Sequence, residues 1–260
     1  MMRRPVTILT ALLVLFCVNM FAQVEMTNEA KKLFKAAETA RKTGDYTGAI
    51  AKFDEALKLS PHPQIYFRRG VALMKAHKLD DAIESYKKAI EMDSNYFQSY
   101  FMMAQVYYSK KEYQKAIDYF EKTAEVSKSK TIKKKVAKNI KNCKEKIAYP
   151  FVVEANTLLL NNKFDAAIAK FNEALAVYER SDAYSGLANA YLEKGNPDKA
   201  LEFAKKSLKA KSRKNVAANF FMGLAYKAKG DKTNAKKYLS KCLRDKNFKQ
   251  RAAFEIKEMK

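Results

Sequence analysis

Few side chains in this sequence could carry out catalysis. Its two histidines are His62, which lies between two prolines, and His77, which lies in a predicted turn between helices. Neither stands at a metal-ligand spacing from other ligand-type residues. The sequence also has no glycine-rich phosphate loop and no nucleophile elbow. We therefore expect a protein that is not an enzyme, with no catalytic residue, no metal site and no cofactor.

Positive charge is a stronger chemical signal. The chain has 51 Lys and Arg against 28 Asp and Glu, which gives a formal net charge of +23. Lysine is densest between Ser129 and Ala148, where Ile132, Val136 and Ile140 recur at helical spacing and predict an amphipathic helix. The candidate basic surface consists of Lys130, Lys133, Lys134, Lys135, Lys138 and Lys141. These lysines could bind an anionic envelope polymer or lipid surface. The alternative is that they are solvated side chains without a partner.

The helices that must position these side chains come from an internal repeat. Residues 44–61 predict a turn, one amphipathic helix and a stop, because Gly44 permits a left-handed turn and Pro61 ends the helix. The helix recurs, and one small residue can be followed along the chain. Its successive copies are Ala49, Ala82, Ala116, Ala167, Ala200 and Ala235, at spacings of 33, 34, 51, 33 and 35 residues.

These spacings, with Tyr or Phe close to the small residues, resemble the tetratricopeptide repeat, whose period is about 34 residues. Each copy also has the earlier helix that this family requires, as in Tyr66, Gly70 and Leu73 of the second copy. The resemblance implies an all-α fold. It would be a solenoid, a right-handed superhelix of helix–turn–helix repeats, with a capping helix at its C-terminal end.

The spacing of 51 residues is about one and a half periods, and it divides the repeats into two blocks. We expect three repeats in residues 23–130, an extra lysine-rich helix in 131–147, three further repeats in 148–246 and a capping helix in 247–260. The extra helix should run nearly straight into the next one, with a kink or short break at Pro150. The apolar residues expected to cover the last repeat are Phe248, Phe254 and Ile256.

Residues 1–22 are expected to lie outside the fold. Arg3 and Arg4 precede an apolar run that is shorter than the roughly 20 residues of a membrane-spanning helix, and Ala22 offers a small residue for cleavage. This pattern is similar to a bacterial secretory signal peptide. We therefore expect an exported protein of the periplasm or cell envelope, with cleavage favoured over a retained anchor.

The two cysteines outside that segment, Cys143 and Cys242, would invite a disulfide in an oxidising compartment. About three repeats separate them, however, and each repeat contacts only its neighbours. Two cysteines so far apart cannot be joined without a large movement of the backbone. We expect no disulfide, and a packed free thiol at Cys242.

Partner binding is the function that the resemblance implies. In tetratricopeptide arrays the first helix of each repeat lines the concave side, where a protein or peptide partner binds. The matching positions of this sequence are Phe34, Phe67, Arg68, Met74, Gln98, Phe101, Met102, Gln105, Tyr108, Asn156, Asn189 and Phe220. Phe101, Met102, Gln105 and Tyr108 are favoured, because aromatic and Met side chains beside amides suit an extended or helical peptide. The alternative for any one apolar position is burial against a neighbouring helix. We expect no nucleic acid as the partner of an exported chain.

One binding mode of the family is not expected. Adaptors that clamp the C-terminal carboxylate of a chaperone need Lys and Asn in one repeat, Asn in the next, and Lys with Arg in the third. At those places the first three repeats have Phe34 and Glu38, then Arg68, then Gln98 and Met102. The clamp is therefore absent from the sequence.

Overall fold

The computed structural model describes residues 25–210 and 215–259, and every regular element in these ranges is an α-helix. The predicted all-α solenoid of helix pairs is confirmed. Packing divides the chain into two units, Met1–Ile140 and Lys141–Lys260, with the boundary inside helix α8 (Lys130–Leu160). The predicted signal segment, residues 1–22, lies outside the described residues. Within the described ranges, no helix combines the length and the apolar character that a membrane crossing needs.

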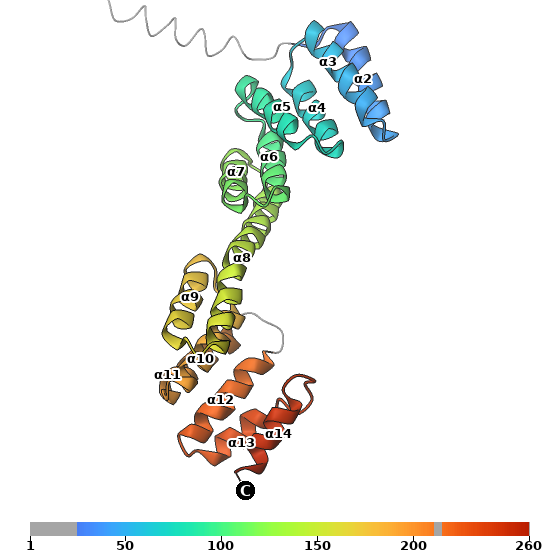
Figure 1. Cartoon of the computed structure of the whole chain (residues 1–260). Coiled ribbons are helices and arrows are strands. Elements are labelled where there is room, and N and C mark those ends of the chain that lie inside the picture. The colour runs from blue at the N-terminus through green and yellow to red at the C-terminus, as the bar shows by residue number, and fades with distance from the viewer. Residues whose placement is uncertain (1–24, 211–214, 260) are drawn as a thin grey trace, which may run out of the picture. The chain divides into compact units, whose positions relative to one another are not determined.

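Unit 1 consists of three helix pairs followed by the first part of α8 (Figure 1). Its paired helices are α2 (Asn28–Lys42), α3 (Tyr46–Leu59), α4 (Pro63–Lys75), α5 (Leu79–Met92), α6 (Phe97–Ser109) and α7 (Tyr113–Val126). The two helices of each pair pack against each other, and α3 and α5 also contact the first helix of the following pair. As the first helices of their pairs, α2, α4 and α6 therefore occupy equivalent places in the repeat.

The turn inside each repeat depends on one residue with a left-handed backbone. In three repeats this residue is a glycine, with φ between 70° and 88°, and the glycines are Gly44, Gly195 and Gly230. In the other three repeats it carries a side chain, with φ between 58° and 63°, and the residues are His77, Lys111 and Asn162. A residue with a Cβ is strained in this conformation by about 1–2 kcal/mol. His77 is therefore the left-handed residue of the turn inside its repeat.

The other histidine, His62, is a helix cap. Its backbone is extended, and its Nδ1 accepts a hydrogen bond from the N–H of Gln64 at 3.1 Å, which satisfies a free donor at the start of α4. Partial burial lowers the pKa of His62. Because an accepting Nδ1 must be unprotonated, the cap requires the neutral imidazole.

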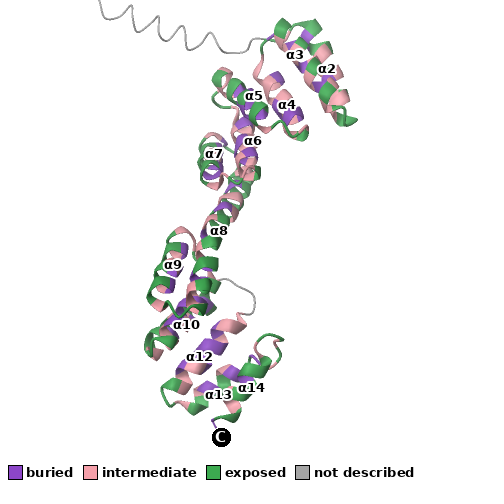
Figure 2. Cartoon of the chain, viewed as in Figure 1, coloured by how far each residue is buried: buried purple, intermediate pink, exposed green. Residues whose placement is uncertain are grey.

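The helices carry both buried and exposed residues along their length (Figure 2). In most repeats an aromatic ring of the second helix fills the space between the helices. These rings come four residues after the recurring alanine and are all buried; they are Phe53, Tyr86, Phe120 and Phe171. A Cβ on Gly70 would lie 2.5 Å from a ring carbon of Tyr86, and one on Gly186 would lie 2.1 Å from a ring carbon of Phe171. The small residues of the sequence pattern therefore leave the space that the large rings occupy.

Unit 2 begins inside α8, which is 31 residues long and continues through Pro150. Its further helices are α9 (Phe164–Val177), α10 (Ser181–Glu193), α11 (Pro197–Lys209), α12 (Val216–Ala228), α13 (Lys232–Ser240) and α14 (Lys249–Lys257). The lysine-rich helix therefore runs on into the first helix of the fourth repeat. The short break that Pro150 suggested does not occur.

Helix α14 and the residues beside it pack on the last repeat through one face. Ala252 and Met259 are buried, and Phe248 and Ile256 are partly buried against the same apolar cluster. Phe254 is 60% exposed, so the expectation that it covers the last repeat is wrong. The four contacting residues recur at spacings of four, four and three, which is one helical face, and Phe254 lies on the other side.

The first part of α8 covers the end of unit 1 in a comparable way. Val136 is 1% exposed, and the Lys135 Nζ lies 4.6 Å from the centre of the Phe101 ring of α6. The extra half period of the sequence therefore supplies a helix that follows the third repeat, as α14 follows the sixth.

Both cysteines of the described chain belong to unit 2, and both are buried free thiols. The Cys242 Sγ lies 3.6 Å from the carbonyl oxygens of Val216 and Tyr238, so the packed thiol expected at this position is confirmed. Burial raises the pKa of each thiol to about 11. Both thiols are therefore protonated near neutral pH.

Candidate functional site

The first helices of unit 1 carry a row of aromatic rings. Each ring rests on a buried ring of the second helix in its own repeat. The pairs of ring centroids are Phe34–Phe53 at 5.7 Å, Phe67–Tyr86 at 6.0 Å and Phe101–Phe120 at 5.6 Å. The outer ring of each pair is only partly buried, whereas the inner ring is fully buried. The repeat thus places one partly exposed aromatic edge at the same point of three successive helices.

The other groove residues predicted in unit 1 share this intermediate exposure. They are Arg68, Met74, Gln98, Met102, Gln105 and Tyr108. Met74 and Met102 pack on the buried cluster around Leu73 and Tyr86, and the Tyr108 ring lies 5.4 Å from the ring of Tyr113. These side chains rest on the core while keeping some surface in contact with solvent. The structure therefore brings the nine groove residues predicted in unit 1 onto α2, α4 and α6.

Charged groups lie beside the middle of this row. Arg41 holds Glu38 of the same helix through two hydrogen bonds, Nε–Oε1 and Nη2–Oε2, both 2.9 Å long. Burial raises the pKa of Glu38, but the hydrogen bonds from Arg41 and the positive charges of Arg68, Arg41 and Lys42 outweigh it, and the net pKa is lowered. Glu38 is therefore a paired carboxylate.

Arg68 of α4 is the charged group without a partner. Its Nε is buried and has no hydrogen-bond partner, and no ion pair of Arg68 occurs among the described residues. The guanidinium carbon lies 5.6 Å from the centre of the Phe67 ring. Tyr96, at the start of α6, packs edge-on against the same ring at 5.3 Å. Glu38, Phe67 and Tyr96 thus surround Arg68 from three successive first helices.

A shallow depression lies at the N-terminal end of the row. Its volume is about 350 Å³, and its lining residues are Glu25, Met26, Lys31, Phe34, His62 and Gln64. Its lining contains both apolar and polar side chains. The aromatic row therefore continues into a concave surface beyond Phe34.

The groove residues predicted in unit 2 have a different outcome. Asn156 of α8 is exposed and Asn189 of α10 is partly buried. Phe220 of α12 is 1% exposed, so its assignment to an open groove is wrong. The ring of Phe248 lies 5.1 Å from it and the guanidinium of Arg251 lies 4.6 Å from its centre. Residues that follow the last repeat therefore cover Phe220 and make it part of the core.

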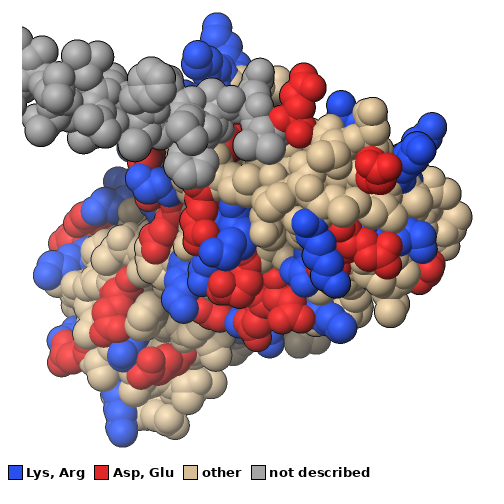
Figure 3. Space-filling view, turned by 90° about the horizontal axis from the view of Figure 1, so that it is seen from above, with Lys and Arg blue, Asp and Glu red and all other residues tan. Residues whose placement is uncertain are grey.

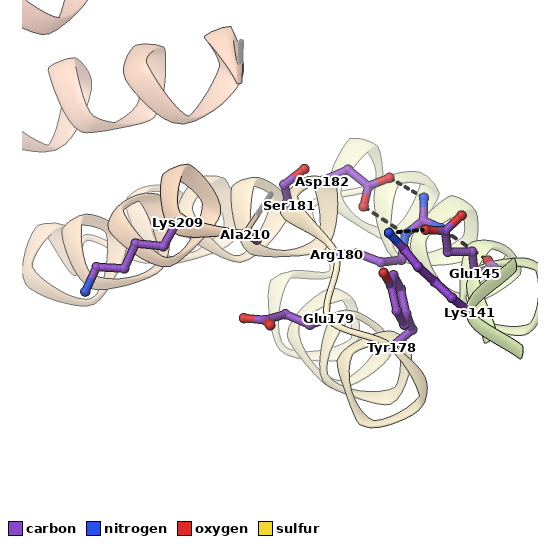
Figure 4. Close-up of a pocket in the computed structure, with 9 residues that line it drawn as sticks. All are labelled: Lys141, Glu145, Tyr178, Glu179, Arg180, Ser181, Asp182, Lys209 and Ala210. Carbon is purple, nitrogen blue, oxygen red and sulfur yellow. Dashed lines mark hydrogen bonds and ion pairs between the residues drawn. The ribbon is translucent and has the colours of Figure 1, made fainter. Parts of the chain in front are cut away.

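A polar cavity of about 660 Å³ in unit 2 was not predicted, except for Lys141 (Figure 4). Arg180 donates to both carboxylate oxygens of Asp182, at 2.9 and 2.6 Å, and to the carbonyl oxygen of Glu145 at 3.2 Å. Lys141 lies 3.8 Å from the Glu145 carboxylate. Figure 4 shows these groups paired with each other, while Lys209 and Glu179 point away from them. The residues come from α8, the turn after α9, the start of α10 and the end of α11. Only the three charged residues within 179–182 hinted at this site.

Charge elsewhere is mostly mixed. Figure 3 shows Lys and Arg interspersed with Asp and Glu on the face in view. The candidate lysines of α8 are all exposed. Of these six, Lys141 is the one that forms an ion pair among the described residues, and Lys135 lies against Phe101. In the same part of the chain, no group of three His, Cys, Asp or Glu side chains could hold a metal ion.

Comparison with known proteins decides the family. One family model described as tetratricopeptide repeat matches residues 34–97, 67–129 and 152–215. A second model with the same description matches residues 216–244. The chain belongs to the tetratricopeptide repeat family. Its repeats, groove positions and turns can therefore be compared with those of other members of that family.

Among curated relatives, this tetratricopeptide repeat protein is 30% identical to human DnaJ homolog subfamily C member 7 over 171 residues, which are 63% of this chain and 33% of that protein. It is 29% identical to the small glutamine-rich tetratricopeptide repeat-containing protein 2 of Mycosarcoma maydis over 108 residues, 41% of this chain and 31% of that protein. The chain thus spans about one third of the length of these relatives. Among solved structures, the TPR2AB domain of yeast Sti1 in complex with pHSP90 shares the fold. Its TM-score is 0.51 at 18% identity, over 88% of this chain and 96% of that one.

Proposed function

We propose that this chain is a non-catalytic protein-interaction scaffold, and that the groove of unit 1 binds an extended or helical segment of a protein partner. The observation that carries the proposal is the row Phe34, Phe67 and Phe101. Each ring stands on a buried ring but keeps an exposed edge. Aligned apolar edges rimmed by polar groups are typical of binding surfaces.

The comparison with solved structures supports partner binding by a fold of this kind. The yeast Sti1 domain that shares the fold is named as a complex with pHSP90, so a solenoid of this kind can hold a partner. The partner itself does not transfer to this chain. Glu38, Arg68 and Met102 stand where a carboxylate clamp would need other residues, and a different segment should therefore be bound.

A displayed library of random dodecapeptides, selected on the full chain, tests the groove. Selected peptides should bind the double variant Phe101→Ala/Tyr108→Ala at least about tenfold more weakly than the unchanged chain. Each partly buried ring should cost only about 1–2 kcal/mol of stability, which thermal unfolding would check. Gln105→Ala removes an amide rather than an apolar side chain. It should therefore weaken peptide binding without lowering the stability of the protein. The exposed Phe254 gives the control Phe254→Ala, which should bind normally. Equal binding by the groove variants would contradict the proposal.

A second candidate function rests on the lysines of α8. Lys130, Lys134 and Lys138 lie on one line of the helix, opposite the buried Val136. They form no ion pairs among the described residues, whereas Lys87, Lys122 and Lys206 each pair with a Glu on their own helix. Unpaired lysines on one face could bind an anionic lipid surface.

Vesicle binding separates this second function from the first. Vesicles of phosphatidylserine and phosphatidylcholine should bind the chain, and phosphatidylcholine alone should not. Replacing the three lysines by Gln should weaken binding by roughly 100-fold, at about 1 kcal/mol for each lysine near the surface. The same replacement at Lys87, Lys122 and Lys206 is the control. Binding that survives in the α8 variant would exclude this function.

Export remains a proposal that rests on Arg3, Arg4, the apolar run and Ala22. In a bacterial host, N-terminal sequencing of the exported protein should begin at or near Gln23. An intact Met1 in the exported, membrane-held protein would contradict cleavage.

A further inference from the structure

Arg68, in the groove of unit 1, is a partly buried cation that the described chain leaves unpaired. Arg68 is partly buried, its Nε is buried without a hydrogen-bond partner, and it forms no ion pair among the described residues. No carboxylate of the described chain compensates the charge of Arg68. A ligand that brings an anionic acceptor to its guanidinium would therefore gain more than one that meets an already paired group.

The neighbours of Arg68 limit the charge of that ligand. Glu38 is already held by both arms of Arg41, so neither of these groups is available to pair with Arg68. With Lys42, which also acts on Glu38, the cluster is positive overall. A carboxylate can accept from the guanidinium through both oxygens and places only one negative charge near Glu38, whereas a phosphate group would place nearly two there. The cluster therefore favours a single carboxylate.

The place of Arg68 in the row determines where the carboxylate sits in a ligand. Arg68 lies on α4, the middle of the three first helices, and α4 contacts both α2 and α6. Phe34 lies on α2 and Phe101 on α6, so apolar rings flank Arg68 on both sides. Helices in contact are about 8–10 Å apart and an extended peptide rises about 3.3 Å per residue. In a peptide that crosses the groove, successive contacts would thus lie roughly three positions apart.

From these observations we infer that Arg68 binds the side-chain carboxylate of an Asp or Glu inside the partner segment, with apolar residues roughly three positions away on each side. Phe67 supports the guanidinium from below, and Arg68 retains donors for both carboxylate oxygens. The ligand is an internal acidic residue rather than a chain terminus, because the peptide continues over α2 and α6. This inference rests on the proposed function of the groove and names the chemistry of its partner.

The test uses peptides selected from the random library on the full chain. Each selected peptide is resynthesised with its acidic residue changed to the amide, and with a free or an amidated C-terminus. On the unchanged chain, the amide version should bind about tenfold more weakly or worse, as expected for a lost hydrogen bond to a charged group. The two forms of the C-terminus should bind equally.

Variants then assign the effect to Arg68. In Arg68→Gln the acidic and amide peptides should bind equally, and Arg68→Lys should restore part of the preference. Lys58→Gln makes the same charge change on an exposed residue of α3 and should keep the full preference. Thermal unfolding of each variant confirms that it is folded before binding is measured.

The outcomes separate this inference from the function beneath it. Selected peptides without Asp or Glu, a preference that persists in Arg68→Gln, or a requirement for a free C-terminus or a phosphate would overturn the role of Arg68 and leave the groove in place. If the selected peptides bind the Phe101→Ala/Tyr108→Ala variant normally, the groove proposal itself fails.

Discussion

Phe101 in unit 1 and Phe220 in unit 2 occupy equivalent positions, but their side chains differ in exposure. Each is the fifth residue of the first helix in the third repeat of its unit. Each has a cation 4.6 Å from its ring, Lys135 for Phe101 and Arg251 for Phe220. Phe101 nevertheless keeps part of its surface exposed, whereas Phe220 is 1% exposed. The repeat alone therefore does not decide whether this position is groove or core.

The difference comes from the residues that follow each third repeat. After α13, the ring of Phe248 packs directly on Phe220 at 5.1 Å. After α7, α8 begins within a lysine-rich segment, and the ring nearest to Phe101 is Phe120 of its own repeat. A following segment with an aromatic residue closes the groove position, and one with only a lysine leaves it open. The same repeat position can thus be core in one unit and partly exposed in the other.

Removing the closing segment should give the largest effect. Truncation after Asp245 would expose the sites of Phe248, Ile256 and Met259, and fully buried side chains of these types contribute about 1.5–3 kcal/mol each. Unit 2 should therefore lose about 4 kcal/mol or more of stability and should self-associate through the uncovered Phe220. Calorimetry and size-exclusion chromatography measure the two effects. An unchanged melting curve and a monomeric profile would show that α14 is not a cap.

Single truncations of the two equivalent rings should differ clearly. Phe220→Ala should destabilise the protein by about 3–5 kcal/mol, the usual cost of emptying a buried aromatic site. Phe101→Ala should cost about 1–2 kcal/mol, because the ring is only partly buried. Chemical denaturation of both variants provides the comparison. Equal losses would remove the distinction between groove and core on which the proposed function depends.

A smaller change should come from Tyr86. Its hydroxyl is buried without a hydrogen-bond partner, and the equivalent residue in the fourth repeat is Phe171. Tyr86→Phe removes an unsatisfied polar group while keeping the ring, so the stability should rise by up to about 1 kcal/mol. Denaturant titration measures it. A loss of stability would show that the hydroxyl has a partner in solution.

The smallest effect concerns two residues that cap the N-termini of helices, His62 in unit 1 and Asn215 in unit 2. The pKa of His62 is lowered by burial, so between its folded pKa and its ordinary value near 6.5 the unfolded chain binds more protons. Unit 1 should therefore lose stability as the pH falls through this window, while the cap of α12, Asn215, has no such dependence. His62→Asn should keep the cap and remove this part of the pH profile. A profile that is identical in both proteins would contradict the role of His62.

Much of the fold could be predicted because its information is local. The recurring alanines and the rings four residues later lie within one repeat, and the glycines opposite the rings lie in the same repeat or the next one. The groove residues of unit 1 followed from the same register. Phe220 did not, because Phe248 and Arg251 cover it from 28 and 31 positions further along the chain. Phe254 was misassigned for a different reason: its helical phase is opposite to that of Ala252 and Ile256. The cavity around Arg180 was missed because three distant segments form it.

The two buried cysteines can be used to measure the local opening of unit 2. Cys143 and Cys242 belong to unit 2, and the described part of unit 1 contains no cysteine. A thiol with a pKa of about 11 in a packed site reacts with a labelling reagent only after its surroundings open. The rate at which Cys143 and Cys242 are labelled therefore counts the openings of unit 2 alone. Adding a peptide that binds the groove of unit 1 and following that rate would show whether peptide binding to unit 1 changes the opening of unit 2.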